Sequence, residues 1–502
     1  MTSVPLFSDN SGMSHPRRWS FTLAGVLILF ALVLGGGIVA TGHWAVLALI
    51  ALVAFFLFLR NPVMGVFVTT ALLLLSGSFG ILGANGAAVP VTAAKVCGLM
   101  TVLAWLIDLV ILRKPVKTPG EMLALCLFFA WSAVGLAFAV DRDQQFAEWF
   151  RLGTLLAFFI LSVHLIDSPE RMHAYTILIA ICGLVMSLFA ITQYFLPTLQ
   201  LASDTAISDI GRGAMGAFVD ADSLQGGPAI RVSGMAGHSN WLAMILLLIL
   251  PLNVYWFMDT PLWRYKALAI VTAGMEFIAL ILTFTRTGFI VGITALAIVA
   301  AKRLIRITPQ RIVAMLLALF FAWMLLPAAY KERVLTFTQY TQSESVTHRT
   351  ELQEAAFNFM VENPVYGVGI GGFGFHLLDA DYTVSDILYW LVKESDWNPL
   401  FYGTHNMYLQ IGSETGIVGL ALFLVFAFIL LRHLRQSELM ARRLGDKRLE
   451  RLAATLEVSL WSFLLCAVFL HALQQKIWWM LAALATALHL YLRRAAHTAE
   501  RD

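Results

Sequence analysis

Apolar residues fall in long runs with short polar breaks along most of the chain. A run of about 20 apolar residues is enough to cross a bilayer as a helix. We place spans near 21–41, 43–59, 62–82, 91–112, 122–140, 149–166, 174–196, 237–257, 267–284, 287–301, 312–329, 406–431, 453–473 and 477–492. The pattern predicts an all-α, polytopic integral membrane protein with about fourteen transmembrane helices, in the range 12–14.

Composition agrees with a membrane protein. Of 502 residues, 59% are apolar and only 13% are charged, whereas soluble domains average about 25% charged residues. The cysteines lie inside apolar runs, so neither a disulfide framework nor a thiolate metal site is indicated. Arg17 and Arg18 precede the first run, which we interpret as a retained helix because more spans follow it.

The basic residues predict the orientation of the chain. With a cytoplasmic N-terminus, 23 of the 34 lysines and arginines lie on the inner side, as the positive-inside rule requires. Both termini are then cytoplasmic. The chain divides into transmembrane helices 1–7 (1–200), a periplasmic loop (201–236), helices 8–11 (237–329), a large periplasmic loop (330–405) and helices 12–14 (406–502).

The longest predicted cytoplasmic loop is the basic stretch 432–451, which we expect beside anionic lipids of the inner leaflet. No inner loop has room for a nucleotide-binding fold, so the chain is not an ATP-driven pump on its own. We expect membrane lipids as partners and no nucleic acid.

The large loop contains a predicted amphipathic helix. Thr347 is a suitable N-cap, and Asn363-Pro364 ends the helix. Its apolar stripe comprises Leu352, Ala355, Ala356, Phe359 and Met360. The glycine-rich turn that follows, from Gly367 to Gly374, is typical of a flexible connector or of a backbone nest that binds an anion.

One histidine stands at the predicted outer end of a span. Gly403-Thr404-His405-Asn406 precedes the apolar run 407–431. If the helix began at His405, then Leu409, Gly412, Gly416 and Gly419 would follow on the same face, and the glycines would let a neighbouring helix approach closely. A loop histidine above a well-packed helix is the alternative interpretation.

Three arginines are predicted on the same side as His405. Arg286 lies in a turn between two short spans, Arg349 lies in the first turn of the loop helix, and Arg231 precedes His238 and Asn240. The alternatives are snorkelling to lipid headgroups for Arg286, a solvated surface charge for Arg349, and simple helix capping for His238 and Asn240. Arginine forks suit phosphate oxygens. A helix N-terminus disfavours imidazolium, and a neutral imidazole accepts a proton near pH 7. The set suits a lipid diphosphate donor whose sugar is attacked by a deprotonated hydroxyl.

These motifs resemble those of the O-antigen ligase and polymerase superfamily, which are membrane glycosyltransferases of the GT-C type. The resemblance covers about 230–431. It rests on His405-Asn406 followed after nine residues by Gly416-Ile417-Val418-Gly419, on Thr283-Phe284-Thr285-Arg286-Thr287-Gly288, on Arg349 through Asn363-Pro364-Val365-Tyr366-Gly367-Val368-Gly369, and on Arg231–Asn240.

The resemblance implies a bacterial inner-membrane enzyme with an undecaprenyl-diphosphate-linked glycan donor and a glycan or lipid A-core acceptor. The reaction would be periplasmic, inverting and free of metal or other cofactor. His405 would be the catalytic base, Arg286 and Arg349 would hold the diphosphate, and Arg231 would be a third contact. Asn406, Gly416 and Gly419 would support the site. Other polysaccharide assembly proteins are expected partners. Ligases of this family usually have fewer than fourteen spans, which favours an exopolysaccharide or O-antigen polymerase.

Other functions remain open at this point. A transporter or flippase of lipid-linked polysaccharide would need internal repeats and several charges at mid-membrane depth, and only Glu276 lies so deep. A non-catalytic scaffold would leave the arginine and histidine set unexplained. The pairs Asp220/Asp222 and Asp379/Asp381 are typical of some metal sites, but so short a pattern also recurs by chance.

Overall fold

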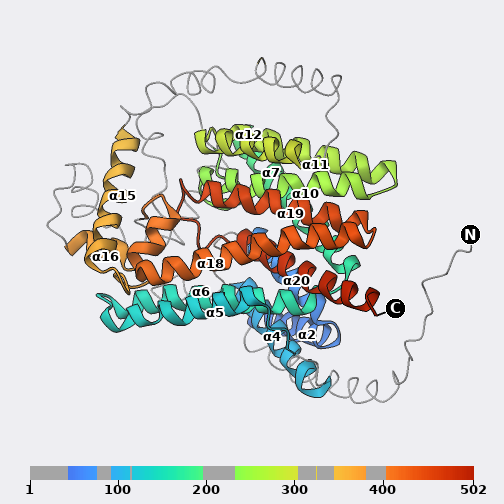
Figure 1. Ribbon diagram of the computed structural model, residues 1–502, viewed down its shortest axis with the longest axis horizontal. Helices are drawn as coiled ribbons and strands as arrows, with labels where there is room; N and C mark the ends of the chain where they lie inside the picture. Colours follow the sequence, from blue (N-terminus) through green and yellow to red (C-terminus); the bar gives the residue numbers. More distant parts are fainter. Residues whose placement is uncertain are drawn as a thin grey trace, which may run out of the picture.

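The computed structural model describes residues 43–75, 92–112, 116–195, 232–302, 324, 344–379 and 403–501, and in these ranges the regular elements are all helices. Most of them run side by side along the long axis of the molecule (Figure 1). The predicted spans 21–41 and, apart from Met324, 312–329 lie outside the described residues. The predicted all-α class is therefore confirmed for this part of the chain.

The N-terminal half supplies the first helices of the bundle. They are α2 (His43–Arg60), α3 (Pro62–Leu75), α4 (Ala93–Leu112), α5 (Gly120–Ser132) with the 3-10 turn η1 (Val134–Phe138), α6 (Arg142–Leu165) and α7 (Pro169–Phe195). Asp141 caps α6, because its carboxylate accepts a hydrogen bond from the Gln144 amide. Each helix coincides with a predicted apolar run, as the hydropathy pattern requires.

The C-terminal half contains the longest helix and two short helices that lie across one end of the bundle. Its elements are η2 (Gly234–Ala236), α10 (Ser239–Asp259), α11 (Trp263–Leu282), α12 (Arg286–Ala301), α15 (Glu344–Glu362), α16 (Phe373–Asp379), α18 (Met407–Arg443), α19 (Lys447–Cys466) and α20 (Lys476–Ala499). Figure 1 shows α15 and α16 at the left, beside the start of α18. We call this the His405 end.

Among the described residues, seven helices are long and apolar enough to cross a membrane: α4, α5 with η1, α6, α7, α10, α11 and α18. Shorter apolar helical segments are Ala51–Arg60 of α2, Pro62–Leu75 (α3) and Arg286–Val299 of α12. The protein is thus a multi-helix membrane protein. The stretch 432–451, expected as a loop, is helical except at 444–446, because α18 continues to Arg443 and α19 begins at Lys447.

The core lies around α10, α19 and α20. Helix α20 is apolar on nearly every face from Ile477 to Leu488, which is typical of a helix surrounded by others, and these residues are buried. Trp478 is 1% exposed and stacks on Phe463 of α19, with ring centroids 4.3 Å apart. The alanines in this segment allow neighbouring helices to approach closely.

Candidate functional site

His405 lies just outside α18. Asn406 is the N-cap, and its side-chain oxygen accepts hydrogen bonds from the amides of Tyr408 and Leu409 at 3.0 and 3.2 Å. His405 has a φ of 52°, a left-handed conformation that costs a non-glycine residue about 1–3 kcal/mol. The prediction that His405 shares a helix face with Leu409 is therefore wrong, because the helix begins only at Met407, after the N-cap Asn406.

The connection between α19 and α20 holds this segment in place. The Met407 amide donates to the Ala467 carbonyl at 2.8 Å. His471 lies edge to face with His405, with ring centroids 5.5 Å apart. A side chain at Gly403 would collide with the His471 ring. His405 is thus supported from a part of the chain that carries none of the four motifs.

Gly416 breaks α18 into two parts. Its φ of 69° and ψ of −177° are not helical, and a break leaves backbone groups in need of partners. The Val368 amide donates to the Ser413 carbonyl at 2.8 Å, and the Ile417 amide donates to the Pro364 carbonyl at 2.7 Å. The two groups are therefore satisfied by the turn that follows α15.

The same break explains why Gly416 has to be glycine. A Cβ there would lie 2.1 Å from the Val365 carbonyl oxygen. On the other side, the indole of Trp131 donates to the Thr415 carbonyl at 3.0 Å. Gly412 leaves space for Met360 of α15, and a Cβ at Gly419 would lie 3.3 Å from the Trp131 ring. The predicted close approach is confirmed, but at Gly416 the partner is a turn and not a helix.

The glycine-rich turn binds a carboxylate of this chain. The backbone amides of Gly371 and Phe373 donate to Glu414, which is buried in α18. The side-chain amide nitrogen of Gln410 donates to the same carboxyl group, and its side-chain oxygen Oε1 accepts from the Thr404 amide at 2.9 Å. The glycine-rich turn thus contacts a carboxyl group of the chain itself and is linked through Gln410 to Thr404, the residue before His405.

Helix α15 carries Arg349 and packs against the start of α18 through its apolar stripe. The predicted stripe is confirmed, because Leu352, Ala355, Ala356 and Phe359 are buried in one cluster with Val368 and Phe373, against Leu409. The helix begins at Glu344 and not after Thr347. Arg349 therefore lies in the second turn, where the helix dipole is weaker, and the dipole argument for an anionic partner loses force.

Arg286 is the first residue of α12. The turn before it is tightly built: Phe284 is 1% exposed with a φ of 51°, and the hydroxyls of Thr283 and Thr285 lie 3.2 Å apart. Phe284 and His405 are the two non-glycine residues with positive φ in the described part of the chain. Backbone strain of this kind clusters at functional sites.

The stretch 232–240 lies beside the Arg286 turn. The Val232 amide donates to the Leu282 carbonyl at 3.3 Å. His238 caps α10, because its Nδ1 accepts from the Asn240 amide at 3.1 Å. Trp241 connects this stretch to His405, since its ring contacts both His238 and His471, at 5.9 and 5.7 Å between centroids. Arg231, Asp220, Asp222 and Asp381 lie outside the described residues.

Glu276 is fully buried and accepts a hydrogen bond from the Asn253 side-chain amide at 2.6 Å. The hydrogen-bond partner of this carboxyl group is therefore a side-chain amide of α10. A side chain at Gly183 would collide with this carboxylate. Glu276 is thus enclosed by α7, α10 and α11, which favours a structural role over a proton relay.

Sequence reasoning missed a group of basic residues near His405. Arg151 lies within electrostatic range of Lys95, Lys476 and His471. It pairs with Glu148 at 2.8 Å. In the orientation predicted from the sequence, Lys95, Arg151 and Lys476 are among the few lysines and arginines on the outer side. That minority was a usable signal, although the sequence did not show that helices α4, α6 and α20 bring them together.

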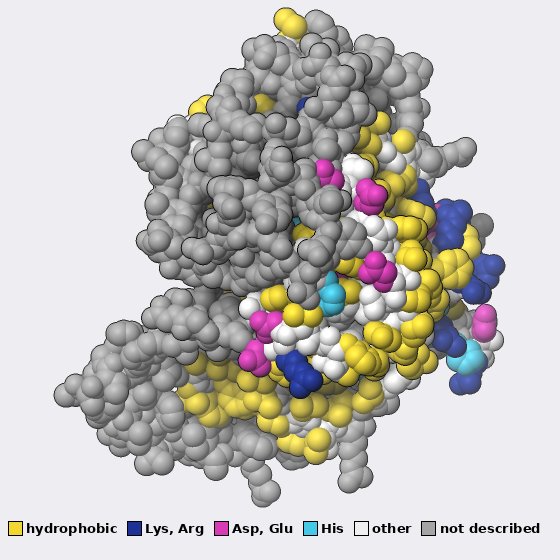
Figure 2. Space-filling model, turned by 90° about the vertical axis from the view of Figure 1, so that its left-hand side faces the viewer, with side chains coloured by type: hydrophobic (Ala, Val, Ile, Leu, Met, Phe, Trp, Pro, Cys, Tyr) yellow, Lys and Arg dark blue, Asp and Glu magenta, His cyan; other side chains and the backbone are white. Residues whose placement is uncertain are grey.

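His471 is held in its neutral form. Burial lowers its pKa to about 4, and the positive charge of Arg151 adds to the effect. Its ring contacts Trp241 and His405. His471 therefore stays uncharged near pH 7 and adds no positive charge beside His405. Figure 2 looks onto this end, where histidine, acidic and basic side chains lie among hydrophobic ones.

The fold and this end of the bundle define a polytopic membrane protein with a polar site where a loop helix lies across the span ends. Residues 268–424 match the family model described as O-antigen ligase, which is consistent with the O-antigen ligase and polymerase superfamily. A comparison with curated proteins found no match. The family is that of ligase- or polymerase-type membrane enzymes that act on lipid-linked polysaccharide and a glycan acceptor.

Proposed function

We propose that the protein is an inverting glycosyltransferase that transfers or polymerises an undecaprenyl-diphosphate-linked glycan at the periplasmic face of the bacterial inner membrane. Polymerisation of exopolysaccharide or O-antigen is favoured over ligation to lipid A-core, because ligases of the family usually have fewer than the fourteen spans that the sequence predicts. The alternative is a transporter or flippase of lipid-linked polysaccharide.

One observation carries the proposal: a chain of contacts links the four sequence motifs in the fold. The Arg286 turn contacts the stretch from Val232 by a hydrogen bond. That stretch reaches His405 through Trp241 and His471. The break at Gly416 then connects the His405 segment to the turn behind Arg349. Motifs scattered over 232–431 serve one site more readily than several.

The residues divide the chemistry between them. His405 takes the proton from an acceptor hydroxyl as that oxygen attacks the anomeric carbon. The bond from this carbon to the diphosphate oxygen breaks, and the lipid diphosphate leaves with the electron pair. Arg286 and Arg349 bind the diphosphate and stabilise its charge, with Arg231 as a third contact. The charge that develops is thus met by arginine side chains, with no metal required in the proposed step.

The reaction can be tested with the full-length protein in proteoliposomes that contain an undecaprenyl-diphosphate-linked oligosaccharide. We expect His405→Ala to lower formation of longer glycan by about 10²–10⁴-fold, the usual contribution of a general base. His497→Ala, which changes a histidine near the C-terminal end of α20, is the matched control.

Normal glycan formation by His405→Ala would refute the role of the base. Movement of labelled lipid-linked sugar across the bilayer by the wild-type protein, with no change in glycan length, would instead favour the transporter.

A further inference from the structure

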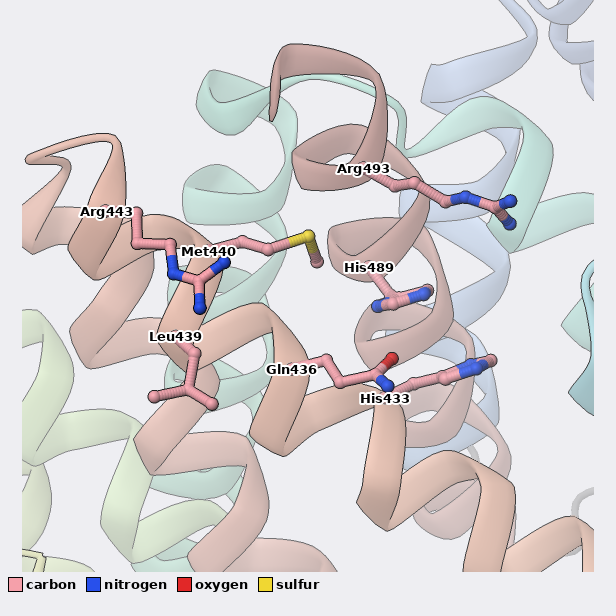
Figure 3. Close-up of a pocket in the computed structure, with 7 residues that line it drawn as sticks. All are labelled: His433, Gln436, Leu439, Met440, Arg443, His489 and Arg493. Carbon is pink, nitrogen blue, oxygen red and sulfur yellow. The ribbon is translucent and has the colours of Figure 1, made fainter. Parts of the chain in front are cut away.

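A second polar site lies at the other end of α18. A pocket of about 390 Å³ opens there between α18 and α20 (Figure 3). Its lining comprises His433, Gln436, Leu439, Met440, Arg443, His489 and Arg493. Figure 3 shows Arg443 and Arg493 on opposite sides of it, from different helices. The pocket thus combines two arginines with apolar side chains.

The partners of the arginines differ sharply in this region. Arg435 and Arg442 bind Glu438 at 2.9 and 3.2 Å, and Arg448 binds Asp259 at 2.9 Å. Among the described residues, Arg443 and Arg493 have no carboxylate at such a distance. Both are exposed. The chain therefore neutralises the neighbouring arginines internally and leaves the two pocket arginines for an external anion.

The inner wall of the pocket is rigid. The rings of His433 and His489 stack at 4.0 Å, with 4° between their planes. His433 is fixed by the buried Glu121 at 2.7 Å, and Ser437 lies 3.2 Å from Nδ1 of His489. Glu121 is therefore fully buried and already paired with His433.

The pocket also lies at the depth of lipid headgroups. The apolar run of α18 ends at Arg432, and that of α20 ends at Arg493. Basic pockets between membrane helices bind anionic headgroups where such runs end. Leu439 and Met440 on its wall offer contact to the glycerol and the first acyl carbons.

We propose that this pocket binds the phosphate ester of an anionic membrane lipid, with Arg443 and Arg493 on the phosphate oxygens. The shared chemistry is a phosphate anion, and the apolar wall and depth favour a lipid over free phosphate. The site stands at the opposite end of α18 from His405, and it does not depend on the proposed transfer reaction.

Native mass spectrometry of the delipidated full-length protein tests the proposal. Dioleoyl phosphatidylglycerol and dioleoyl phosphatidylcholine are the lipid probes. We expect tighter binding of phosphatidylglycerol, and a loss of about tenfold in the double variant Arg443→Gln/Arg493→Gln. Arg435→Gln/Arg442→Gln removes the same charge from arginines paired with Glu438, and we expect it to bind like the wild type.

Equal binding of both lipids would overturn the proposal, and so would an equal loss in the two double variants. Inorganic phosphate is the third probe, beside the two lipids. If millimolar phosphate displaces phosphatidylglycerol completely, the pocket is a site for the free anion, and the lipid assignment is wrong.

Discussion

The two ends of α18 treat their charged side chains differently. Around the turn to α19, Glu438 binds Lys302, Arg435 and Arg442, and Asp259 binds Arg448. At the His405 end, Lys95, Arg151 and Lys476 lie within electrostatic range of one another beside Glu148. Cations that share a carboxylate stabilise the fold. Cations that repel each other cost stability, which a ligand can offset.

The ends also differ in backbone conformation. The His405 end has positive φ at His405 and at Gly416, where other chain segments press against the backbone. The opposite end has positive φ only at Gly445 among its described residues, and a Cβ there would meet nothing within 4 Å. Strain under close contact marks the candidate site, and strain in open space marks an ordinary helix end. Variants at the two ends test this difference.

Gly416→Ala should have the largest effect. The added Cβ would collide with a backbone carbonyl at 2.1 Å and would hold an unfavourable φ, so we expect a loss of about 3 kcal/mol or more and no glycan transfer. Gly445→Ala carries the same unfavourable φ in open space and should cost about 1 kcal/mol. Thermal unfolding in detergent and product gels measure both. Equal behaviour of the two variants would contradict the special role of the break.

Arg286→Lys and Arg349→Lys keep the charge but lose the planar fork. Each should lower transfer by about 10–100-fold, the equivalent of one or two charged hydrogen bonds, with little change in stability. Arg435→Lys at the other end is the control and should transfer at the wild-type rate. Full activity in both site variants would exclude a diphosphate clamp made of arginine forks.

His471 should make stability depend on pH. Its pKa is lowered to about 4 by burial and by Arg151, so the unfolded chain takes up the proton first. The stabilisation is complete above about pH 6.5 and is lost as the pH falls toward 4, by at most about 3 kcal/mol. Unfolding temperatures of the wild type and His471→Gln should therefore converge on acidification. Parallel curves would mean that His471 does not titrate in this range.

Asn406→Ala should cost about 1 kcal/mol of stability, the usual loss when an N-cap is removed. Asp446→Ala removes the matching cap of α19, whose carboxylate accepts from Arg448 and Leu449 amides at 3.0 Å. We expect similar unfolding temperatures for the two variants but lower transfer only for Asn406→Ala, because that cap orients His405. Equal transfer rates would make Asn406 an ordinary cap.

Hydropathy was sufficient to place the described bundle helices, because burial in a membrane imposes a long apolar run on each of them. The first residues of α12 and α18 differ from the predicted first residues of these spans by one position. The stretch 432–451 was harder, since paired charges allow a helix to continue beyond the apolar run. Its acids, Glu438, Asp446 and Glu450, were visible in the sequence, but the distant partner Lys302 was not.

The candidate site was predictable by residue type more than by geometry. His405, Arg286 and Arg349 stand in local motifs, whereas His471 and Arg151 reach the site only through helix packing. The sequence also put His405 and Gly416 on one regular helix. The break depends on hydrogen bonds to the Pro364 carbonyl and from the Val368 amide. Both residues lie some 50 residues away in the chain, so no local pattern predicts the break.

The break in α18 also has a mechanical consequence. If the turn after α15 lifted away, the Ser413 carbonyl and the Ile417 amide would lose their partners within an apolar helix, where water cannot replace them cheaply. The outer half of α18 is thus tied to the end of the loop helix through its backbone. A displacement of α15 would therefore be transmitted to the break at Gly416, and from there to the part of α18 that follows His405.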